Sequence, residues 1–359
     1  MKRPEILQNC EVIIGNANKR FSGVTSTMLQ TLAHQKKCVS LCVLGKHHLP
    51  EDSASLVVSF SDLARGLKQP LVDGRYRVFH ARRNDEMIQA LLLKHVFGAK
   101  IRILFTSTAQ RHHSKFTRWL MSHMDAVIST CQAAANYLKT PPLTLVPHGI
   151  DTNIYFPDTE PNTADEIHVG MFGRVRAQKG CDILVKAAIA VLPNHSNVSV
   201  TIVGAIAPDQ RDFVEDLKKQ VHAAGLQQRI TFTGELSFDK IPPLFRSMDL
   251  VCALSLNEGF GLTVLEAMSS GAAVLASEAG AWPDIVKPGV HGALVPTADL
   301  DATTRALDTL LSDKAKLESM GQAGRETVLK HYKIEQEAAK LCEIYRQLQG
   351  GENSPYKLT

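Results

Sequence analysis

The sequence contains no apolar run as long as the roughly 18 residues that a membrane-spanning helix needs. Aromatic residues make up only 6% of its 359 residues and charged residues 21%, while 44% are hydrophobic. This balance is typical of a globular protein and excludes collagen, low-complexity chains and disulfide-stapled miniproteins. The start of the chain leads only into the short apolar stretch 12–14, so we expect a protein that is neither secreted nor membrane-spanning.

Cysteine is also scarce. The chain has seven cysteines, an odd number, and no two of them form a Cys-x-x-Cys pair. Most lie in apolar segments, such as those around Cys42 and Cys252. Reduced, buried thiols of this kind are typical of a reducing compartment, so the pattern predicts a cytoplasmic protein without a disulfide framework.

The small net charge of +4 conceals an uneven distribution. Residues 1–150 contain 20 Lys and Arg against nine Asp and Glu, a balance of +11, and residues 151–359 carry −7. Much of the excess lies between Arg65 and Arg118. A positive domain attracts anionic partners such as phospholipid headgroups, a phosphorylated substrate or nucleic acid. A basic surface that binds only solvent is the alternative.

Short β-type runs alternate with helical patterns along the whole chain, which predicts an α/β fold with parallel sheets. In the first half we expect strands at 12–15, 39–44, 77–79, 101–106, 126–129 and 144–146, and helices at 24–35, 86–96, 116–123 and 131–138. After a polar stretch the pattern restarts, with strands at 167–172, 199–203, 230–233, 250–254 and 273–276, and helices at 181–191, 210–224, 241–247 and 263–269.

Two Rossmann-like domains follow from this pattern, one over residues 1–150 and one over 167–359. A linker rich in Thr, Pro, Asn and acidic residues is expected over 151–166, where the charge balance changes sign. The last helix could pack back onto the first domain. Ligands of such sheets bind at the carboxyl ends of the strands, so the cleft between the domains is the expected site.

The first chemical motif is the segment 170–180, GMFGRVRAQKG, which joins a predicted strand to a predicted helix. Gly173 allows the backbone to approach a ligand, and a helix N-terminus favours an anion. Arg174 offers a planar fork and Lys179 a point charge to a diphosphate. The segment is neither a Walker loop nor a dinucleotide-binding GxGxxG. An ordinary turn with solvated cations is the alternative.

The second motif is NEGFGLTVLEAM at 257–268, again between a strand and a helix. Glu258 lies in the loop, and Glu266 lies about one turn inside the helix. Both carboxylates could reach one elongated ligand, whose phosphate the amides of 260–262 could bind. A purely structural role, stabilised by the helix dipole, is the alternative for Glu266.

Three other features have simpler explanations. The Asp-x-Asp sequence at 299–301 is better interpreted as a helix cap than as a metal site. The pairs at 47–48 and 112–113 are histidines without the spacing of metal ligands, so no metal is expected. A stripe edged by basic residues could rest on a membrane, although core packing is the more frequent explanation; it consists of Phe116, Trp119, Leu120 and Met124, with Lys115, Arg118 and His123 beside it.

Together, GRVRAQKG at 173–180 and EGFGLTVLEA at 258–267 resemble the retaining nucleotide-sugar glycosyltransferases of the GT-B fold, family 4 of the glycosyltransferase classification. Similar segments run over nearly the whole chain, at 21–24 (FSGV), 146–151 (VPHGID) and 288–295 (PGVHGALV). The segments 21–27, 80–84 and 105–107 look most like the lipopolysaccharide-core mannosyltransferases of Gram-negative bacteria.

The resemblance implies a donor site made of Gly23, Gly173, Arg174, Lys179, Phe260, Gly261, Leu262, Thr263 and Glu266. Arg174 and Lys179 would bind the diphosphate, and Glu266 the ribose hydroxyls. Glu258 would contact the hexose, with His80 facing the sugar, so the expected catalytic residues are Arg174, Lys179, Glu258 and His80. Arg82 and Arg83 would belong to the acceptor side.

The sequence departs from the family pattern in three places. Ser22 replaces one glycine of a paired-glycine loop, and His148 stands where asparagine is usual. The histidine that commonly follows the strand at 101–106 is missing. This last departure leaves the polar residues on the acceptor side unassigned.

The resemblance predicts a metal-independent hexosyltransferase that moves mannose from GDP-mannose to a lipopolysaccharide-core acceptor, without a cofactor. It would work as a peripheral protein on the cytoplasmic face of the inner membrane. Another nucleotide sugar, another lipid or small-molecule acceptor, or a nucleotide-sugar epimerase are the enzymatic alternatives. The non-enzyme alternative is a basic nucleic-acid-binding module, for which the basic half contains no recognised motif. The sequence does not determine the oligomeric state.

Overall fold

The computed structural model describes residues 7–19, 22–158 and 165–350. The chain forms two compact units: unit 1 comprises residues 1–148 and 334–359, and unit 2 comprises residues 149–333. The chain therefore passes between the units twice, after His148 and after Lys333. The expected boundary at 150 lies within two residues of the first passage. The last helix is grouped with unit 1. The predicted linker over 151–166 includes residues 159–164, which lie outside the described ranges, and stays a prediction.

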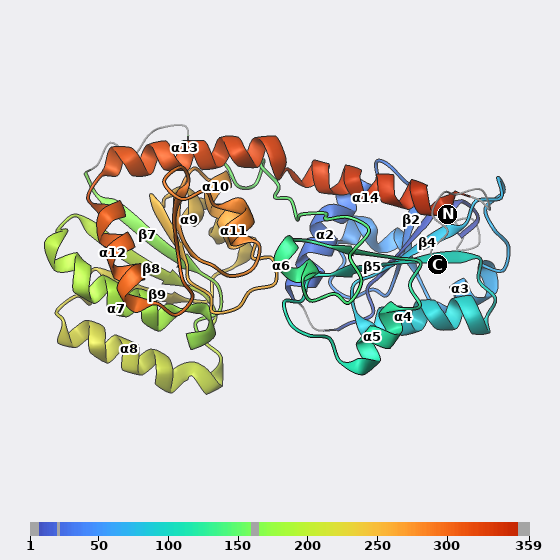
Figure 1. The fold of residues 1–359 in the computed structure, drawn as a ribbon, viewed down its shortest axis with the longest axis horizontal. Helices are drawn as coiled ribbons and strands as arrows, with labels where there is room; N and C mark the ends of the chain where they lie inside the picture. Colours follow the sequence, from blue (N-terminus) through green and yellow to red (C-terminus); the bar gives the residue numbers. More distant parts are fainter. Residues whose placement is uncertain (1–6, 20–21, 159–164, 351–359) are drawn as a thin grey trace. The chain divides into compact units, whose positions relative to one another are not determined.

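Unit 1 is a six-stranded, fully parallel sheet with helices packed around it (Figure 1). In the order β3-β2-β1-β4-β5-β6, its strands are β1 (Val12–Gly15), β2 (Leu41–Leu44), β3 (Val57–Val58), β4 (Arg77–Ala81), β5 (Ile101–Ser107) and β6 (Ala126–Ser129). Its helices are α2 (Gly23–Gln35), α3 (Phe60–Gly66), α4 (Asn84–Leu91), a π-helical turn that continues α4 (Leu92–Val96), α5 (Lys115–Met121), α6 (Gln132–Ala135) and α14 (Ile334–Gln349).

Unit 2 repeats this architecture with a second six-stranded parallel sheet, ordered β12-β11-β10-β7-β8-β9. Its strands are β7 (Ile167–Phe172), β8 (Val198–Val203), β9 (Ile230–Gly234), β10 (Leu250–Ala253), β11 (Ala273–Ser277) and β12 (Gly292–Val295). Its helices are α7 (Cys181–Val191), α8 (Arg211–Ala223), α9 (Ile241–Arg246), α10 (Thr263–Ser269), α11 (Trp282–Ile285), α12 (Leu300–Leu311) and α13 (Lys314–His331). The expected class, two α/β domains with parallel sheets, is confirmed.

The central strands are buried on both faces, as parallel strands between helices must be, whereas the edge strand β9 is partly exposed. In unit 1, one core contains Ile13, Phe79 and Ile103, and the other contains Ile14 and Val78. The second core includes residues of α14, and Figure 1 shows this helix lying alongside α2. Helix α14 thus completes the core of a domain whose other elements lie between residues 12 and 135.

Some local expectations were wrong. The segment 144–146 is not a strand, because only Leu145 forms a bridge, with Ser129. Six of the seven cysteines are buried as expected, but Cys38 is exposed.

The cap prediction at 299–301 is confirmed, since the Asp299 side chain accepts a hydrogen bond of 2.8 Å from the Ala302 amide at the start of α12. Across the described ranges, no helix combines the length and apolarity needed to span a bilayer.

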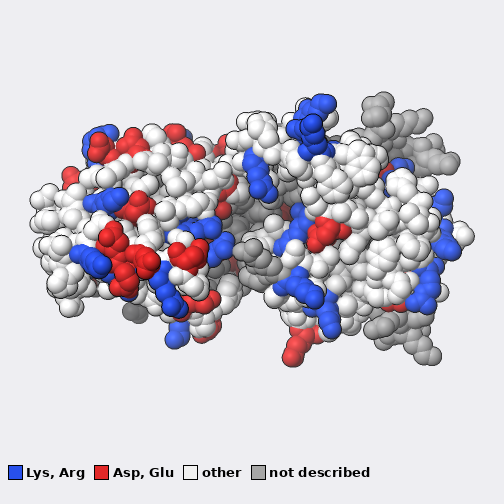
Figure 2. Space-filling model, turned by 90° about the horizontal axis from the view of Figure 1, so that it is seen from below, with Lys and Arg blue, Asp and Glu red and all other residues white. Residues whose placement is uncertain are grey.

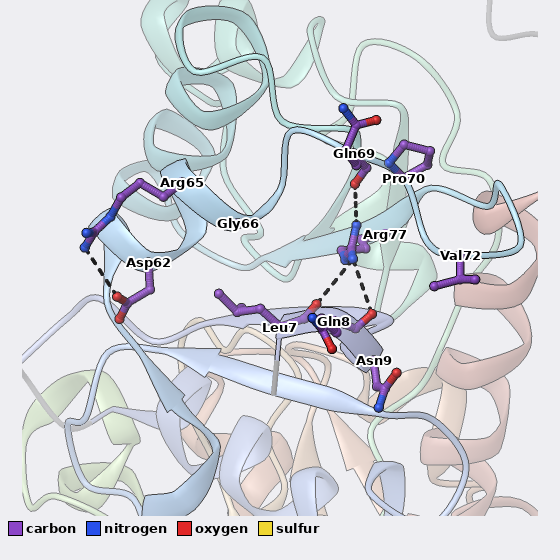
Figure 3. A pocket seen from close by; sticks show the side chains of 10 residues that line it. All are labelled: Leu7, Gln8, Asn9, Asp62, Arg65, Gly66, Gln69, Pro70, Val72 and Arg77. Atoms are coloured by element: carbon purple, nitrogen blue, oxygen red, sulfur yellow. Dashed lines mark hydrogen bonds and ion pairs between the residues drawn. The ribbon is translucent and has the colours of Figure 1, made fainter. Parts of the chain in front are cut away.

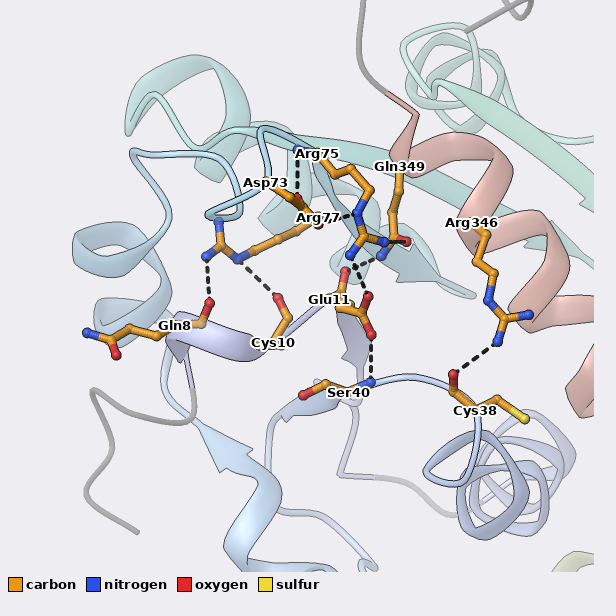
Figure 4. Close-up of polar contacts among 10 residues, drawn as sticks. All are labelled: Gln8, Cys10, Glu11, Cys38, Ser40, Asp73, Arg75, Arg77, Arg346 and Gln349. Atoms are coloured by element: carbon orange, nitrogen blue, oxygen red, sulfur yellow. Dashed lines mark hydrogen bonds and ion pairs between the residues drawn. The ribbon is translucent and has the colours of Figure 1, made fainter.

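The amino-terminal edge of unit 1's sheet is held together by polar contacts that involve α14 (Figure 4). Arg75 forms an ion pair of 3.1 Å with Glu11 and donates a hydrogen bond to the Gln349 side chain. Arg346 donates to the Cys38 carbonyl oxygen. These contacts tie both the β1 segment and α2's end to the last helix.

Candidate functional site

The loop between β7 and α7 begins at Gly173 and ends at Gly180. Gly173 has a positive φ of 129°. Gly204 of the neighbouring loop lies so close to it that a Cβ on Gly204 would overlap the Gly173 carbonyl oxygen. Gly180, at φ 74°, lies against the backbone carbonyl of Leu254. Both left-handed positions need glycine, so the sequence pattern reflects backbone geometry at the carboxyl edge of the sheet.

The loop that follows β10 lies directly beside this first loop, because β10 and β7 are neighbours in the sheet. The Leu256 amide donates to the Gln178 carbonyl oxygen at 2.9 Å, and the Gln178 side chain donates to the Asn257 carbonyl oxygen. The indole of Trp282 donates to the Gly261 carbonyl oxygen at 2.9 Å and so fixes the turn before α10. The two sequence motifs therefore form one site.

Lys179 and Glu258 form a direct ion pair across the two loops. Both side chains are about one-fifth exposed, and the Ser255 hydroxyl donates a second hydrogen bond to the Glu258 carboxylate at 3.3 Å. Ser255 itself is fixed by Ser277, whose hydroxyl donates to its carbonyl oxygen. The predicted phosphate-binding lysine is therefore already positioned, with a carboxylate beside it that an incoming anion could replace.

Arg174, in the same loop, is exposed and has no side-chain ion pair or hydrogen bond within the described ranges. Arg176, which the sequence analysis did not select, lies near it. Burial lowers the pKa of Arg176 and the charge of Arg174 lowers it further, while Glu258 and Asp209 raise it. Its Nε is buried without a hydrogen-bond partner among the described residues. Three cations thus converge where the motifs predict a diphosphate.

Glu266 lies in the first turn of α10, where a negative charge is favoured. Burial raises its pKa to about 7, and a hydrogen bond from Tyr155 and the nearby charge of Lys179 oppose that rise. Tyr155 is itself buried, and burial and Glu266 raise the pKa of its phenol. The carboxylate is therefore held by a residue that the sequence analysis missed, because nothing in the local pattern links position 155 to position 266.

Tyr155 is fixed by a network of its own. Its backbone carbonyl oxygen accepts hydrogen bonds from Ser269 at 2.7 Å and from Arg325 at 2.9 Å. Its ring meets Phe245 edge-on, and Phe245 stacks on Phe172 at the end of β7 with centroids 3.7 Å apart. Helix α13, through Arg325, thus orients the phenol toward Glu266.

The remaining predicted donor residues have different exposures. The Phe260 side chain is buried, so any ligand contact there would use its backbone. Gly261, Leu262 and Thr263 are partly exposed at the start of α10, where a helix leaves N–H groups without intrahelical acceptors. Gly261 needs glycine, because a Cβ at its φ of 83° would meet Trp282 and Glu258.

In unit 1, Gly23 begins α2 at the carboxyl edge of the sheet and is exposed, with open space around it. Arg83 donates hydrogen bonds to Ser22 at 2.7 Å and to Thr25 at 2.8 Å. The serine that replaces a glycine of the family pattern thus has a partner. Phe21, part of the family-like segment, lies outside the described residues.

Arg82 contributes its backbone amide to the Glu86 carboxylate at 2.7 Å. One of its guanidinium nitrogens, Nη1, is buried and has no hydrogen-bond partner in the described part of the chain. A buried donor without a partner is costly, so this nitrogen is suited to a ligand or water. The Arg82 side chain also hydrogen-bonds Tyr345, and its charge acts on His80, so the guanidinium is engaged within unit 1 apart from Nη1.

His80 is fully buried, and both of its ring nitrogens are occupied. Nδ1 lies 2.6 Å from the Tyr345 hydroxyl of α14, and Nε2 lies 2.7 Å from the Thr106 hydroxyl. Burial lowers its pKa well below the usual value, as does the charge of Arg82, so the ring is neutral. In this arrangement His80 links β4, β5 and α14, and contact with a sugar would require one of its partners to move.

Two departures from the family pattern, His148 and the histidine missing after the strand at 101–106, can be followed in the structure. His148 lies 2.8 Å from Glu337 of α14, and both side chains are buried. His113, in the loop after β5, folds back to Ser107 at the strand's carboxyl end, with 3.2 Å between Nε2 and Oγ. Burial lowers the pKa of His113, as do Arg111 and Arg118. A histidine thus lies at the end of β5 after all, but it comes several residues later in the sequence than the histidine of the family pattern. The spacing of residues in the sequence did not reveal this.

A cavity of about 730 Å³ opens at the opposite, amino-terminal edge of unit 1's sheet (Figure 3). The buried guanidinium of Arg77 lies at its wall and donates to the carbonyl oxygens of Leu7, Cys10 and Gln69. Burial lowers the pKa of Arg77. Because carbonyl oxygens use its donors, Arg77 serves the structure of this edge and is separate from the predicted site.

The chain is similar to known proteins along its whole length. The family model described as "Glycosyl transferases group 1" matches residues 156–327, which include both loops of the site. The lipopolysaccharide core biosynthesis mannosyltransferase LpcC of Rhizobium leguminosarum bv. viciae is 38% identical, covering 97% of this chain and 99% of its own. LpsB of Rhizobium meliloti, with the same description, is 38% identical over 95% of this chain and 99% of its own.

Among solved structures, HepE of Anabaena in complex with UDP matches with a TM-score of 0.80. The match covers 94% of this chain and 100% of HepE, at 19% identity, and it concerns the fold. The expected GT-B fold class is thereby confirmed. The similarity to LpcC and LpsB extends over both units, including α14, and therefore concerns the whole protein rather than one domain. This chain belongs to the group 1 glycosyltransferases.

Proposed function

We propose that this glycosyltransferase moves mannose from GDP-mannose to a lipopolysaccharide-core acceptor and retains the anomeric configuration. The observation that carries the donor assignment is the convergence of Arg174, Lys179, Glu258 and Glu266 at the carboxyl edge of unit 2's sheet. Mannose and the core acceptor are supported by the whole-length similarity to two mannosyltransferases of lipopolysaccharide core biosynthesis.

Each charged residue of the site has a role in this proposal. The leaving diphosphate gains negative charge as the glycosyl–phosphate bond breaks, and preorganised cations stabilise that charge. The diphosphate would take the position beside Lys179 that Glu258 now occupies, with Arg174 binding it through two parallel hydrogen bonds. Glu258, released from the lysine, would accept a hydrogen bond from the hexose, while Glu266 accepts from the ribose hydroxyls.

Retention follows from transfer on one face of the sugar. The acceptor oxygen forms a bond to the anomeric carbon as the bond from that carbon to the diphosphate oxygen breaks on the same face. The acceptor proton passes to an oxygen of the leaving diphosphate. This route uses neither a protein nucleophile nor a metal or other cofactor.

The acceptor side and the location are part of the proposal. A lipopolysaccharide-core acceptor is anchored in a bilayer and carries anionic groups, which suits the basic residues 1–150. Arg82 and Arg83 are the residues of unit 1 that we assign to the acceptor side. The enzyme would act as a peripheral protein on the cytoplasmic face of the inner membrane.

A thermal-shift panel of nucleotide sugars tests the donor. At about 100 times its dissociation constant, a bound donor adds about 2.7 kcal/mol to the folded state. We expect GDP-mannose to raise the melting temperature more than UDP-glucose or UDP-galactose at equal concentration. No shift with any GDP compound would contradict the donor assignment.

Transfer is then measured with a purified core acceptor, and the anomeric configuration of the product is read by NMR. Mannose joined with retained configuration is the expected result. Inverted product would contradict the proposed route. Conversion of the donor sugar without attachment to the acceptor would instead identify an epimerase.

A further inference from the structure

Helices α4 and α5 of unit 1 expose large apolar side chains to solvent. On α5, Phe116 and Trp119 are 53% and 54% exposed. Along α4 and its π-helical turn, the exposed fractions are 36% for Ile88, 42% for Leu92 and 68% for Val96. The two helices pack against each other, as Figure 1 shows, and the Asn84 side chain donates to Thr117 at 2.8 Å between them. The exposed apolar residues therefore belong to two helices that lie against each other.

Packing into the core does not explain why α5 carries two large aromatic side chains at exposed positions. Leu120 is fully buried and Thr117 nearly so, and these residues form the inward side of the helix. Phe116 and Trp119 lie on the outward side, where their rings are nearly parallel, with centroids 6.1 Å apart and an angle of 19°. Core packing thus accounts for Leu120 but not for the aromatic pair.

Basic residues outnumber acidic ones along the segment that carries these helices. From residue 87 to residue 124 the sequence has no Asp or Glu but six Lys and Arg. Lys94 and Arg102 pair with Asp125, whereas Arg111, Lys115 and Arg118 have no ion pair within the described ranges. Figure 2 views unit 1 from the side where α4 and α5 lie in Figure 1, and it shows Lys and Arg side chains, with fewer Asp and Glu, within a broad uncharged surface.

We propose that this surface docks onto the anionic headgroups of a lipid bilayer. We call it the α4–α5 face and define it by Ile88, Leu92, Val96, Phe116 and Trp119, with Arg111, Lys115 and Arg118 at its margin. Exposed aromatic and aliphatic side chains bordered by basic ones are typical of helices that lie in a membrane interface. Basic residues near the surface of a membrane add attraction to anionic lipids.

Docking there would bring the acceptor side of the enzyme to its substrate. All strands of unit 1 are parallel, so their carboxyl ends share one edge, and the loop 108–114 connects that edge to α5. Arg82 and Gly23 follow strand ends at the same edge. The inference rests on the proposed function only for the identity of this substrate, a membrane-anchored glycolipid.

A second copy of the chain is the other occupant that such a face could have. Two identical α4–α5 faces would bring Arg111, Lys115 and Arg118 of both copies together, and like charges at an interface are unfavourable. An anionic bilayer complements the same charges. The charge pattern therefore favours the membrane.

The test is co-sedimentation of the full chain with vesicles. One set contains phosphatidylglycerol and phosphatidylethanolamine, and the other contains phosphatidylcholine alone. We expect binding to the anionic vesicles and a loss of affinity of about tenfold or more when Phe116→Ser and Trp119→Ser are combined. Phe238→Ser is the matched control, because Phe238 is an exposed aromatic residue of unit 2 at 63%, and it should leave binding unchanged.

Tryptophan fluorescence provides a second measurement. The chain has two tryptophans, and Trp282 is buried at 1% exposure, so a shift on vesicle binding reports Trp119. We expect a blue shift with anionic vesicles that Trp119→Phe abolishes while most of the binding remains. An unshifted spectrum in fully vesicle-bound protein would contradict insertion of the α4–α5 face.

Two further outcomes would overturn the proposal. One is equal vesicle binding by the wild type and the Phe116→Ser, Trp119→Ser variant. The other is a dimer in sedimentation equilibrium that the same variant dissociates, which would assign the face to self-association. Donor binding is measured on the same samples: vesicle docking without donor binding would contradict the proposed function alone, and donor binding without docking would contradict this inference alone.

Discussion

Lys179 has a carboxylate partner at the position where the proposed donor would place its diphosphate. Lys179→Ala should lower turnover by about 100-fold, the scale of losing one preorganised group that stabilises developing charge. The fold should persist, because Lys179 lies in a loop beyond the end of β7 and outside the core of unit 2. Steady-state kinetics and thermal melting together provide the measurement.

Lys186→Ala is a suitable control for that variant. Lys186 forms an ordinary ion pair of 3.6 Å with Asp182 on the exposed side of α7, and such pairs contribute little. We expect wild-type kinetics from it. If Lys179→Ala also retained turnover within about threefold of wild type, Lys179 would have no part in stabilising the leaving group.

The titration of Glu266 gives donor binding a predicted pH dependence. Its pKa of about 7 means that the carboxylate form, which accepts hydrogen bonds from ribose hydroxyls, becomes dominant as the pH rises through 7. Affinity for the nucleotide sugar, whose phosphates do not titrate in this range, should therefore increase from pH 6 to pH 8. Calorimetry at a series of pH values measures this change.

Two variants separate the carboxylate from its partner. Glu266→Gln should bind weakly and without this pH dependence. Tyr155→Phe removes a hydrogen bond that lowers the pKa of Glu266, so its binding curve should move to higher pH. An unchanged midpoint in Tyr155→Phe would show that the phenol does not control the charge of Glu266.

The same raised pKa affects folding with the opposite sign. The folded-state pKa of Glu266 lies above its ordinary value of 4.5, so the folded protein holds this proton more tightly than the unfolded chain does. The contribution of Glu266 to the free energy of unfolding should fall as the pH rises from about 4.5 to 7. A bound ribose would compensate for that loss where the enzyme works.

At the scale of single elements, regular patterns in the sequence were sufficient to predict much of the fold. The strands at 12–15, 126–129 and 167–172 and the helices at 181–191 and 263–269 have the predicted bounds. Each is a continuous apolar or amphipathic run, and all but the helix at 181–191 end at, or directly before, glycine or a polar residue. The two-residue strand β3 was missed because it is too short to show any alternation.

The candidate site, like the fold, was predicted from the sequence only in part. Local motifs predicted both loops of unit 2, because glycines, cations and carboxylates occur there at short spacing. Tyr155 and Tyr345 were missed, since their partners Glu266 and His80 lie 111 and 265 positions away in sequence. Side-chain pairing at such separation depends on strand order and helix packing, which one sequence does not specify.

Gly180 shows how strictly an element can depend on one residue. It begins α7 at a φ of 74°, and a Cβ would overlap the Leu254 carbonyl oxygen. Gly180→Ala should lower the free energy of unfolding by more than the roughly 1–2 kcal/mol of a left-handed alanine. It should also displace the adjacent Lys179 and weaken donor binding.

Gly225→Ala isolates the effect of the overlap. Gly225 has nearly the same φ, 70°, but a Cβ there would meet no atom within 4 Å. The Gly225→Ala variant should lose only the free energy that a left-handed backbone costs an alanine, roughly 1–2 kcal/mol. Chemical denaturation of both variants gives the comparison, and equal losses would mean that the contact with Leu254 relaxes freely.

At the scale of the whole molecule, the chain leaves unit 1 after His148 and returns to it at Ile334. Unit 1 therefore cannot complete its core until residues 334–349 have been made. Leu341, Ile344, Tyr345 and Leu348 of α14 are all buried in one of its two cores. Unit 2, by contrast, is one continuous segment with its own core. The stability of unit 1 should thus respond to α14 separately from that of unit 2.

Combining Leu341→Ala and Tyr345→Ala in the full chain tests this dependence. Truncating a buried leucine or aromatic side chain costs about 2–5 kcal/mol, which is large against the 5–15 kcal/mol that stabilises a typical domain. The double variant also removes the Tyr345 hydroxyl from His80. We expect unit 1 to unfold at a lower temperature, while unit 2 keeps its melting transition and its affinity for the nucleotide sugar. Glu343→Ala, an exposed substitution on the same helix, should change neither transition. A single transition that moves as a whole in the double variant would show instead that the two units unfold as one cooperative system.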